Sequence, residues 1–462
     1  MVILTKVIMG SMAKAEGINQ DRITQLPDDI VSHIFSFLPT VDAVRNTLLS
    51  KKFNQVWTKL KTLDFDSERE FRKCRGGNAF LTFVSRVLYF RDGSEIRTFR
   101  LKLSRKRYLP CVGDWICAAV KRKVVELDLD LNFDVWTDFE LPPCIFWCKT
   151  LEVLKLNLSP WEVTGDIPTS GCFPILKFLH VTVFNPSIRE MEKLLSHFPV
   201  LEELTIDGTG EDLDDFGTCS FQVSAPKLKM LRISLESLSE PVDIHVNAPQ
   251  LETLDLQRLG LTNCFLDGSA NSLVNASIAF REKFEIKGPF DLSNSTMELL
   301  NQVSDVKSLS VSAHCLEDLH LPENYYLPSF GNVNQLRLAF GNHSCWELLA
   351  RFLNSAPNLE ILVLDDRTEG HKELSEIHWN PPEQVPSSLL SNLKTICFKG
   401  FKGRLFEMEM IKYLLKNGQL LNKMTISTGL HLSYDRQNEL YTEFMMFHRT
   451  ATCHVEFMHM EV

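Results

Sequence analysis

The chain has 462 residues, of which 44% are hydrophobic and 23% are charged. This length exceeds what one compact hydrophobic core normally organises, so we expect either several domains or a repeat array that is folded almost throughout. The formal net charge of −10 argues against nucleic acid as the main partner, because affinity for phosphate backbones depends on clustered Lys and Arg.

We expect a flexible segment over residues 1–20. Its apolar start is interrupted by Lys6, lacks a preceding basic region and falls short of the roughly 20 residues that cross a bilayer. The sequence therefore predicts neither a signal peptide nor a membrane anchor. The 12 cysteines of the chain follow no framework spacing, which is typical of buried thiols in a reducing compartment. We expect an intracellular protein, in the cytoplasm, the nucleus or both.

Residues 21–66 are predicted to hold three short helices. Pro27 and Asp28 form a helix-start signal, Pro39 ends the first helix, and Ser50 can cap the third. The apolar residues of the first helix follow at helical spacing: Ile30, Ile34, Phe37 and Leu38.

The first helix carries more apolar surface than one small core can cover. Val31 and Phe35 add to the stripe that Ile30 and Ile34 begin, and a unit of about 40 residues is only marginally stable alone. We therefore expect the surplus surface to dock onto a partner or onto the following domain. A plain helical cap for a solenoid is the alternative interpretation.

The segment LPDDIVSHIFSFLP, with Leu49-Ser50-Lys51-Lys52 and Trp57 after it, resembles the F-box motif in its plant form. This resemblance implies binding to a Skp-type adaptor and, through it, to a cullin ligase core. The implied adaptor-binding residues are Leu26, Pro27, Ile30, Ile34, Phe35, Leu38, Pro39 and Leu49. Two positions depart from the family pattern: Val41 stands where the family usually has Lys, and Phe53 where it usually has Trp.

The pattern apolar-x-x-apolar-x-apolar recurs through the rest of the chain. It begins at Leu60, Ile96, Val124, Leu151, Leu176, Leu201, Leu228, Leu251, Leu273, Val306, Val333, Leu359, Leu393 and Leu421. Its central spacings of 22 to 27 residues fall in the range of leucine-rich repeats. We therefore predict an α/β solenoid, a horseshoe of parallel strands over residues 67–375. It should be irregular, because the spacing varies and the consensus Asn is missing.

Each predicted strand alternates buried and outward residues. Leu204 and Ile206 should point into the stack, while Glu203, Thr205 and Asp207 should point outward. The repeats would then bury a continuous apolar spine and display the alternate side chains.

Alignment of the predicted strands places opposite charges on neighbours. Arg100 should neighbour Asp128, which should neighbour Lys155, and Lys102 should neighbour Asp130. Arg100, Asp128 and Lys155 are candidates for a recognition strip for a protein substrate. The alternative, which we favour, is a self-neutralising ladder worth at most about 1 kcal/mol per exposed pair.

The later strands differ in their outward residues. Ile361 and Val363 are both apolar and both predicted to face outward. An apolar docking patch for a substrate is therefore more plausible toward the C-terminal half of the solenoid.

Residues 376–462 are predicted to cap the solenoid. Strand-like pieces near Leu393 and Leu421 flank a predicted helix with the apolar face Met408, Ile411, Leu414 and Leu415. The segment resembles the FBD domain that follows F-box and leucine-rich repeats in plant proteins. The matching residues are Trp379, Pro381-Pro382, Val385-Pro386, Leu389-Leu390, Gly400, Gly403 and Tyr413-Leu414-Leu415-Lys416-Asn417.

No motif for catalysis or for a cofactor is recognised. Cys144 and Cys148 have a CxxxC spacing, but no second close pair completes a structural zinc site, so we interpret them as buried thiols. We find no glycine-rich phosphate loop, HExxH or nucleophile elbow. We assign no catalytic, metal or cofactor residues.

The three resemblances together imply the substrate-recognition subunit of an SCF-type E3 ubiquitin ligase, a non-catalytic adaptor that promotes ubiquitin transfer by proximity. Two alternatives stay open. One is a ligase-independent repeat scaffold whose helical start is only a cap. The other is a small-molecule co-receptor acting through the ligase, which an apolar concave pocket would support.

Overall fold

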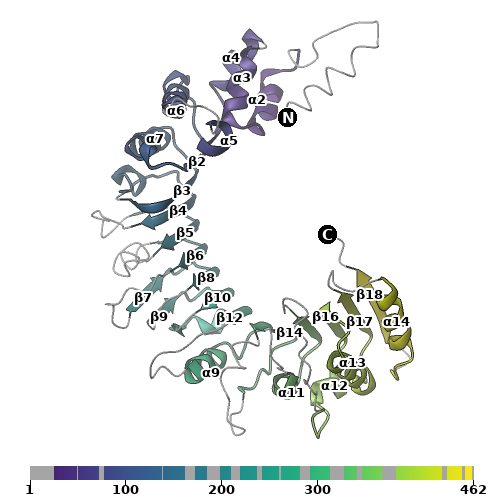
Figure 1. The fold of residues 1–462 in the computed structure, drawn as a ribbon. Helices are drawn as coiled ribbons and strands as arrows, with labels where there is room; N and C mark the ends of the chain where they lie inside the picture. The colour runs from purple at the N-terminus through teal and green to yellow at the C-terminus, as the bar shows by residue number, and fades with distance from the viewer. Residues whose placement is uncertain are drawn as a thin grey trace, which may run out of the picture.

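A computed structural model describes most of the chain. The described residues are 25–48, 50–71, 78–137, 139–161, 172–184, 198–209, 219–236, 242–259, 262–280, 292–312, 327–340, 346–366, 381–428, 434–449 and 453–459. They form an open arc with strands along its inner side and helices along its outer side (Figure 1). The fold is an α/β solenoid, as the repeat pattern predicts. No helix among these residues is long and apolar enough to span a bilayer.

Short helices open the described chain: α2 (Asp28–Ser36), α3 (Thr40–Arg45), the 3-10 turn η1 (Asn46–Leu48) and α4 (Lys51–Trp57). Ser50 caps α4 as predicted, because its hydroxyl accepts a hydrogen bond from the backbone N–H of Lys52 at 3.3 Å. The Thr40 hydroxyl accepts one from the backbone N–H of Asp64 at 2.7 Å, which ties α3 to the first strand of the solenoid.

The first helix buries the face that we expected to be surplus. Val31 and Phe35 are buried, whereas Ile30 and Ile34 are exposed. The reason is tertiary: the Phe35 ring packs on Phe53 of α4 at a centroid distance of 5.2 Å. The sequence shows two adjacent apolar stripes on α2, and the position of α4 decides which stripe enters the core.

Among the described residues, fifteen parallel strands form the main sheet in the order β1-β2-β3-β4-β5-β6-β8-β10-β12-β13-β14-β15-β16-β17-β18. Their bounds are β1 (Thr62–Asp66), β2 (Thr98–Lys102), β3 (Glu126–Thr137), β4 (Val153–Trp161), β5 (Phe178–Phe184), β6 (Glu203–Thr209), β8 (Met230–Glu236), β10 (Thr253–Leu259), β12 (Asn275–Phe280), β13 (Ser308–Ser312), β14 (Gln335–Phe340), β15 (Ile361–Asp366), β16 (Thr395–Phe401), β17 (Lys423–Thr428) and β18 (His454–His459). Each predicted pattern starts two residues before one of these strands. Only β18 lacks a predicted counterpart.

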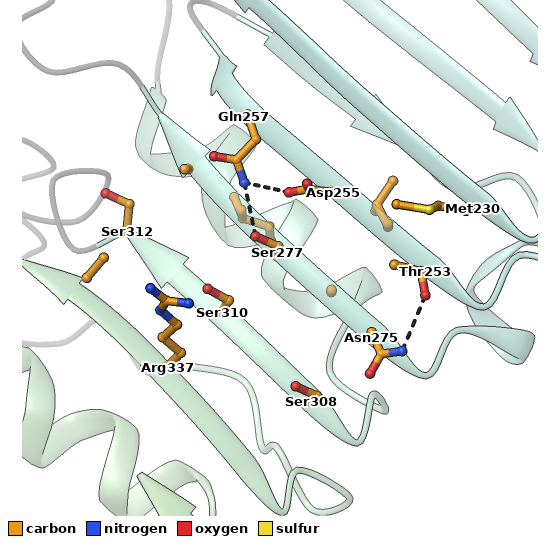
Figure 2. Close-up of a pocket in the computed structure, with 15 residues that line it drawn as sticks. Met230, Thr253, Asp255, Gln257, Asn275, Ser277, Ser308, Ser310, Ser312 and Arg337 are labelled. Atoms are coloured by element: carbon orange, nitrogen blue, oxygen red, sulfur yellow. Dashed lines mark hydrogen bonds between the residues drawn. The ribbon is translucent and has the colours of Figure 1, made fainter. Parts of the chain in front are cut away.

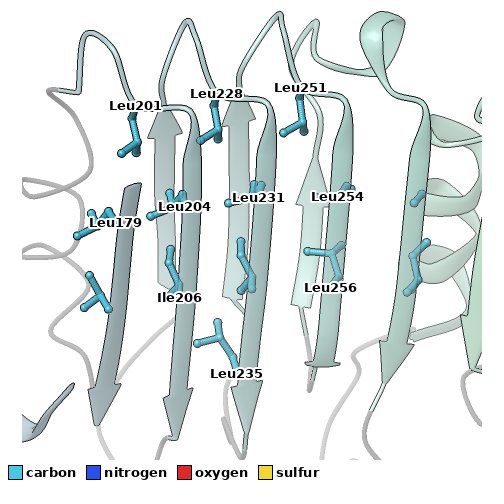
Figure 3. Packing of buried hydrophobic residues seen from close by; sticks show 14 of the residues in the cluster. Leu179, Leu201, Leu204, Ile206, Leu228, Leu231, Leu235, Leu251, Leu254 and Leu256 are labelled. Atoms are coloured by element: carbon cyan, nitrogen blue, oxygen red, sulfur yellow. The ribbon is translucent and has the colours of Figure 1, made fainter. Parts of the chain in front are cut away.

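The core is a stack of apolar rows, one residue from each strand. Leu204 pairs in register with Leu231, which pairs with Leu254, and all three are buried (Figure 3). Ile206 lies in the next row, while Thr205 between them points outward, as predicted. Each row extends from repeat to repeat, so every strand depends on its neighbours to cover its buried side.

The outer side holds helices and a second sheet. The helices are α5 (Ser67–Phe71), α6 (Ala79–Phe90), α7 (Leu109–Lys121), α9 (Leu292–Gln302) and α11 (Trp346–Ser355), and the 3-10 turns are η2 (Lys106–Tyr108), η3 (Pro143–Ile145) and η4 (Ala270–Ser272). The second sheet has the order β11-β9-β7, from β7 (Cys219–Ser224), β9 (Val242–Asn247) and β11 (Thr262–Phe265). We did not predict this second sheet.

The C-terminal part continues the same parallel sheet. Helix α12 (Ser387–Ser391) precedes β16, α13 (Leu405–Asn417) connects β16 to β17, and α14 (Tyr434–Met445) connects β17 to β18. The predicted apolar face of α13 is buried: Met408, Ile411, Leu414 and Leu415. Trp379 lies outside the described residues.

Candidate functional surfaces

Helix α2 presents an apolar face to solvent. Ile30 is 47% exposed, Ile34 41% and Phe37 75%, and their spacing of four and three residues places them on one side of the helix. Leu48 in η1 is 87% exposed. The N-terminal helices therefore cover the end of the solenoid with one face, and a second apolar face stays exposed to solvent among the residues that the structure describes.

The turn that enters α2 is fixed by Lys52 of α4. The Lys52 ammonium donates to the carbonyl oxygen of Leu26 at 2.6 Å and lies 3.4 Å from an Asp28 carboxylate oxygen. Leu26 packs partly against the core, while Pro27 is exposed beside the apolar face.

The remaining positions of the F-box resemblance divide between core and surface. Phe35 is only 4% exposed, so the apolar face of α2 forms without it. Leu38 and Pro39 are half-buried at the end of α2. Leu49 lies outside the described residues. The two departures from the family pattern, Val41 and Phe53, are buried, and so they lie behind the exposed face.

The predicted charges do meet across β2, β3 and β4. The register pairs Arg100 with Asp128 and Asp128 with Lys155, which confirms these neighbours. The closest contacts go to Glu126, however, whose Oε1 accepts from Arg100 at 3.2 Å and lies 3.5 Å from the Lys155 ammonium. Burial is the largest single influence on Glu126 and opposes its ionisation, but the hydrogen bond and charge of Arg100, the charge of Lys155 and a hydrogen bond from Thr98 together outweigh it and hold the pKa of that carboxyl below its ordinary value. Burial raises the pKa of Asp128.

Further ion pairs extend this ladder. Lys102 lies 2.8 Å from Asp130, as the alignment predicts, and Asn157 donates to the same carboxylate at 3.0 Å. A second ladder at the entry to the strands pairs Lys177 with Glu152, Lys229 with Glu202 and Lys394 with Glu360. Most charges on the N-terminal part of the inner face are therefore neutralised within the protein, which supports the interpretation as a self-neutralising ladder.

The inner face is hollowed at its middle (Figure 2). The hollow has a volume of about 320 Å³, and its lining comes from β8, β10, β12, β13 and β14. Seven of its fifteen lining residues carry hydroxyl or amide groups, including Ser277, Ser308, Ser310 and Ser312, and six are apolar. None of these residues was predicted from the sequence to belong to a site. The signal available was the succession of short outward residues on two adjacent repeats.

Beside the hollow, β15 carries the two apolar residues predicted to face outward. Ile361 is exposed and Val363 is half-buried. The register places Val363 next to Arg337 of β14 and Cys397 of β16. The outward side of β15 thus adjoins the C-terminal wall of the hollow.

A buried charged cluster joins β15 to the C-terminal part. The Asp366 carboxylate is almost fully buried and lies 3.0 Å from the Lys402 ammonium and 3.6 Å from the Arg404 guanidinium. Glu407 Oε2 accepts from the backbone N–H groups of Lys402 and Arg404 at 3.2 and 2.8 Å. Burial, with the charge of Asp366, raises the pKa of Glu407 to about 7.

Two thiols meet on the outer side. Cys117 of α7 and Cys144 of η3 have their sulfur atoms 2.9 Å apart, whereas Cys148 is buried beside the carbonyl oxygen of Val124. Burial raises the pKa of Cys144 to about 12. In the described part of the chain, no group of three His, Cys, Asp or Glu side chains is arranged to hold a metal ion.

Comparison with known families finds three consecutive matches. The F-box domain matches residues 23–65, the family described as "FBD-associated F-box protein At5g56370, LRR repeats" matches residues 112–364, and FBD matches residues 380–426. The repeat match alone covers more than half of the chain.

Several curated proteins of Arabidopsis thaliana are similar along nearly their whole length. "FBD-associated F-box protein At1g66310" is 30% identical over 96% of this chain and 97% of its own length. "F-box/FBD/LRR-repeat protein At1g78750" is 31% identical over 88% of this chain and 89% of its own. "FBD-associated F-box protein At4g10400" is 30% identical over 95% of this chain and 100% of its own. The chain belongs to the plant family of FBD-associated F-box proteins with leucine-rich repeats.

Proposed function

We propose that this protein is the substrate-recognition subunit of an SCF-type E3 ubiquitin ligase. An F-box followed by leucine-rich repeats is in general the arrangement of a ligase substrate receptor, and proteins of this kind are typically non-catalytic adaptors inside the cell. In this proposal the N-terminal module binds a Skp-type adaptor and, through it, the cullin core. The solenoid then holds a protein substrate close to the transferred ubiquitin.

The exposed apolar face of α2 is the observation that carries the proposal. Ile30, Ile34 and Phe37 stay exposed although the same helix already buries Val31 and Phe35 against its own module. A simple cap needs only the buried face, and an exposed apolar face on a small helical module is typical of a docking surface. Leu26 and Pro27 lie at the entry to this face.

Adaptor co-purification tests the proposal. Ile34→Asp places a charge in the apolar face without touching the core, so we expect it to abolish capture of a purified Skp-type adaptor that the wild type captures. Met446→Asp is the matched control, because Met446 is 79% exposed at the opposite end of the chain. If the wild type captures no adaptor, the ligase-independent scaffold becomes the better interpretation.

For the substrate surface, we propose that Ile361 and Val363 contact the substrate and that Arg100, Asp128 and Lys155 stabilise the sheet. A charge-reversal scan of Asp128 and Asp130 that abolished substrate capture without unfolding the protein would contradict this assignment. The small-molecule co-receptor is less favoured, because an apolar pocket would support it, whereas nine of the fifteen residues that line the hollow of the inner face are polar or charged.

We further propose the domain division 21–66, 67–375 and 376–462, preceded by a flexible segment over residues 1–20. The last unit would act as the cap of the irregular horseshoe. The continuation of the main sheet through β16, β17 and β18 supports this role.

A further inference from the structure

We infer that the hollow over β12 and β13 binds a short, uncharged, polar segment of the substrate in extended conformation. The inference rests on the proposed function, and it specifies a place on the inner face and a chemical class. The hollow lies between Asp255 and Gln257 on one side and Arg337 on the other (Figure 2).

The hollow exists because outward side chains are short on neighbouring strands. In the middle outward row, the register runs from Asp255 through Ser277 and Ser310 to Arg337. In this row, Asp255 and Arg337 thus flank two strands that each carry only a hydroxymethyl group. The volume of about 320 Å³ lies near the lower end of the roughly 300–1,000 Å³ that ligand sites occupy.

The floor of the hollow carries hydrogen-bonding groups. The side chains of Ser308, Ser310 and Ser312 form no hydrogen bond with the other residues that line the hollow (Figure 2); Ser308 and Ser310 are half-buried, and Ser312 is 8% exposed. None of these hydroxyls is a fully buried group without a partner, so water can bond to them in the hollow, and a ligand binds by replacing that water with donors and acceptors of its own.

The spacing of these hydroxyls matches an extended chain. Ser308, Ser310 and Ser312 are alternate residues of one strand, so they recur about every 6.6 Å along β13. An extended peptide repeats its own polar groups at the same interval when it runs along β13. Side chains of Ser, Thr, Asn or Gln at alternate positions of the peptide would each meet one hydroxyl of the floor.

The charges at the rim are already paired. Arg337 donates to Asp365 at 2.6 Å, and Asp255 lies 3.6 Å from Arg232 and also accepts from Gln257. A charged side chain entering the hollow would lose hydration without gaining an unpaired opposite charge. The occupant is therefore neutral, and a phosphate or carboxylate in the same place weakens binding.

Fluorescence polarisation with defined peptides tests the inference on the full-length protein alone, so that the result does not depend on adaptor binding. The probe is a labelled hexapeptide library with Ser, Thr, Asn or Gln at alternate positions and Ala or Val between them. Three matched libraries carry Asp, phosphoserine or Lys at one of the polar positions. We expect members of the neutral library to bind, and their charged counterparts to bind at least tenfold more weakly.

Two variants locate the binding. Ser310→Trp fills the hollow and should weaken binding of the neutral peptides at least tenfold. Ser310→Ala/Ser312→Ala removes hydroxyls without adding volume and should weaken that binding at least fivefold. Thr205→Trp is the control, since Thr205 is an outward residue on β6, away from the hollow. Thermal melting of each variant confirms that it is folded.

Three results would overturn the inference: no neutral peptide binds, a charged library binds better than the neutral one, or Thr205→Trp weakens binding as much as Ser310→Trp. The proposed function fails separately. Adaptor capture is measured separately on the same wild-type preparation. If the adaptor is not captured, the proposed function fails, but peptide binding to the solenoid should be unchanged.

Discussion

At the scale of single residues, Glu407 is the most informative titrating group. It is buried, one of its carboxylate oxygens has no hydrogen-bond partner among the described residues, and its pKa is raised from 4.5 to about 7. The folded protein therefore binds the Glu407 proton more tightly than the unfolded chain does. The stability that this proton contributes is complete below about pH 4.5 and is lost as the pH rises through 7.

The change Glu407→Gln should remove this pH dependence. For the wild type we expect the free energy of unfolding to fall by on the order of 3 kcal/mol between pH 4.5 and 8 through this group. The variant should lack that part of the decline, because a neutral amide stays in the same place. Urea denaturation of both proteins at pH 5.5 and pH 8 measures the free energy of unfolding. An equal change between the two pH values in wild type and variant would contradict the assignment.

Cys117 and Cys144 are close enough for an oxidant to join them. A disulfide needs its two Cβ atoms about 3.8 Å apart, and two sulfur atoms 2.9 Å apart require only small adjustment. In the reaction with diamide, each thiol gives up one hydrogen to the reagent as the sulfur–sulfur bond forms. Because burial raises the pKa of Cys144 to about 12, thiolate is scarce at pH 7.

We therefore expect slow cross-linking by diamide at pH 7, with a rate that increases severalfold for each unit up to pH 9. Intact mass and peptide mapping measure the loss of two hydrogens and identify the linked peptides. Cys144→Ser should prevent the link. A fast reaction at pH 7, or a linkage through other cysteines, would show that the two thiols are not held as the structure places them.

At the scale of elements, Gly400 allows β16 to continue into the C-terminal part. It has a φ of +71°, and an added Cβ would lie 2.2 Å from the carbonyl oxygen of Asp366 on the neighbouring strand. Gly400→Ala should therefore destabilise the protein by about 3 kcal/mol, from the left-handed backbone and the clash together. Gly331→Ala is the control, because no atom lies within 4 Å of its added Cβ.

Thermal melting measures this difference. We expect a clearly lower melting temperature for Gly400→Ala and little change for Gly331→Ala. Equal melting temperatures would mean that β16 relaxes away from Asp366 without loss, and that the close approach is not required for the fold.

The strands were predictable because their buried residues repeat. A leucine or similar residue stands two positions before most strands, and inward residues such as Leu204 and Ile206 alternate with polar ones. The last strand, β18, escaped prediction because Thr452 occupies the leading apolar position. The choice between the two apolar stripes of α2 was not readable either, since it depends on where α4 places Phe53.

The candidate surfaces were predictable to different degrees. The neighbours of Asp128 could be predicted from the strand register alone. That Glu126 contacts both Arg100 and Lys155 could not, because those contacts depend on how far the side chains reach across the strands. The hollow depends on the relative length of side chains from five strands, so its depth is a property of the assembled sheet.

At the scale of the whole molecule, each repeat relies on the next to cover its core. Leu362 and Leu364 of β15 are fully buried, and the register places Ile396 and Phe398 of β16 beside them. Asp366 is neutralised by Lys402 and Arg404 from the C-terminal part. Removal of residues 381–462 would expose these leucines, leave a buried carboxylate without its counter-charges, and free the hydrogen-bonding edge of β15.

We therefore expect a chain of residues 1–380 to aggregate or to melt well below the full-length protein. A chain of residues 1–449 is the matched comparison: it loses β18 but keeps β16, α13, β17 and the cluster around Asp366, so it should stay closer to the wild type. Size-exclusion chromatography and thermal melting of the two truncations measure the difference. A monomeric 1–380 chain with an unchanged melting temperature would show instead that the C-terminal part is an independent domain, and that the solenoid ends at β15 without needing a cap.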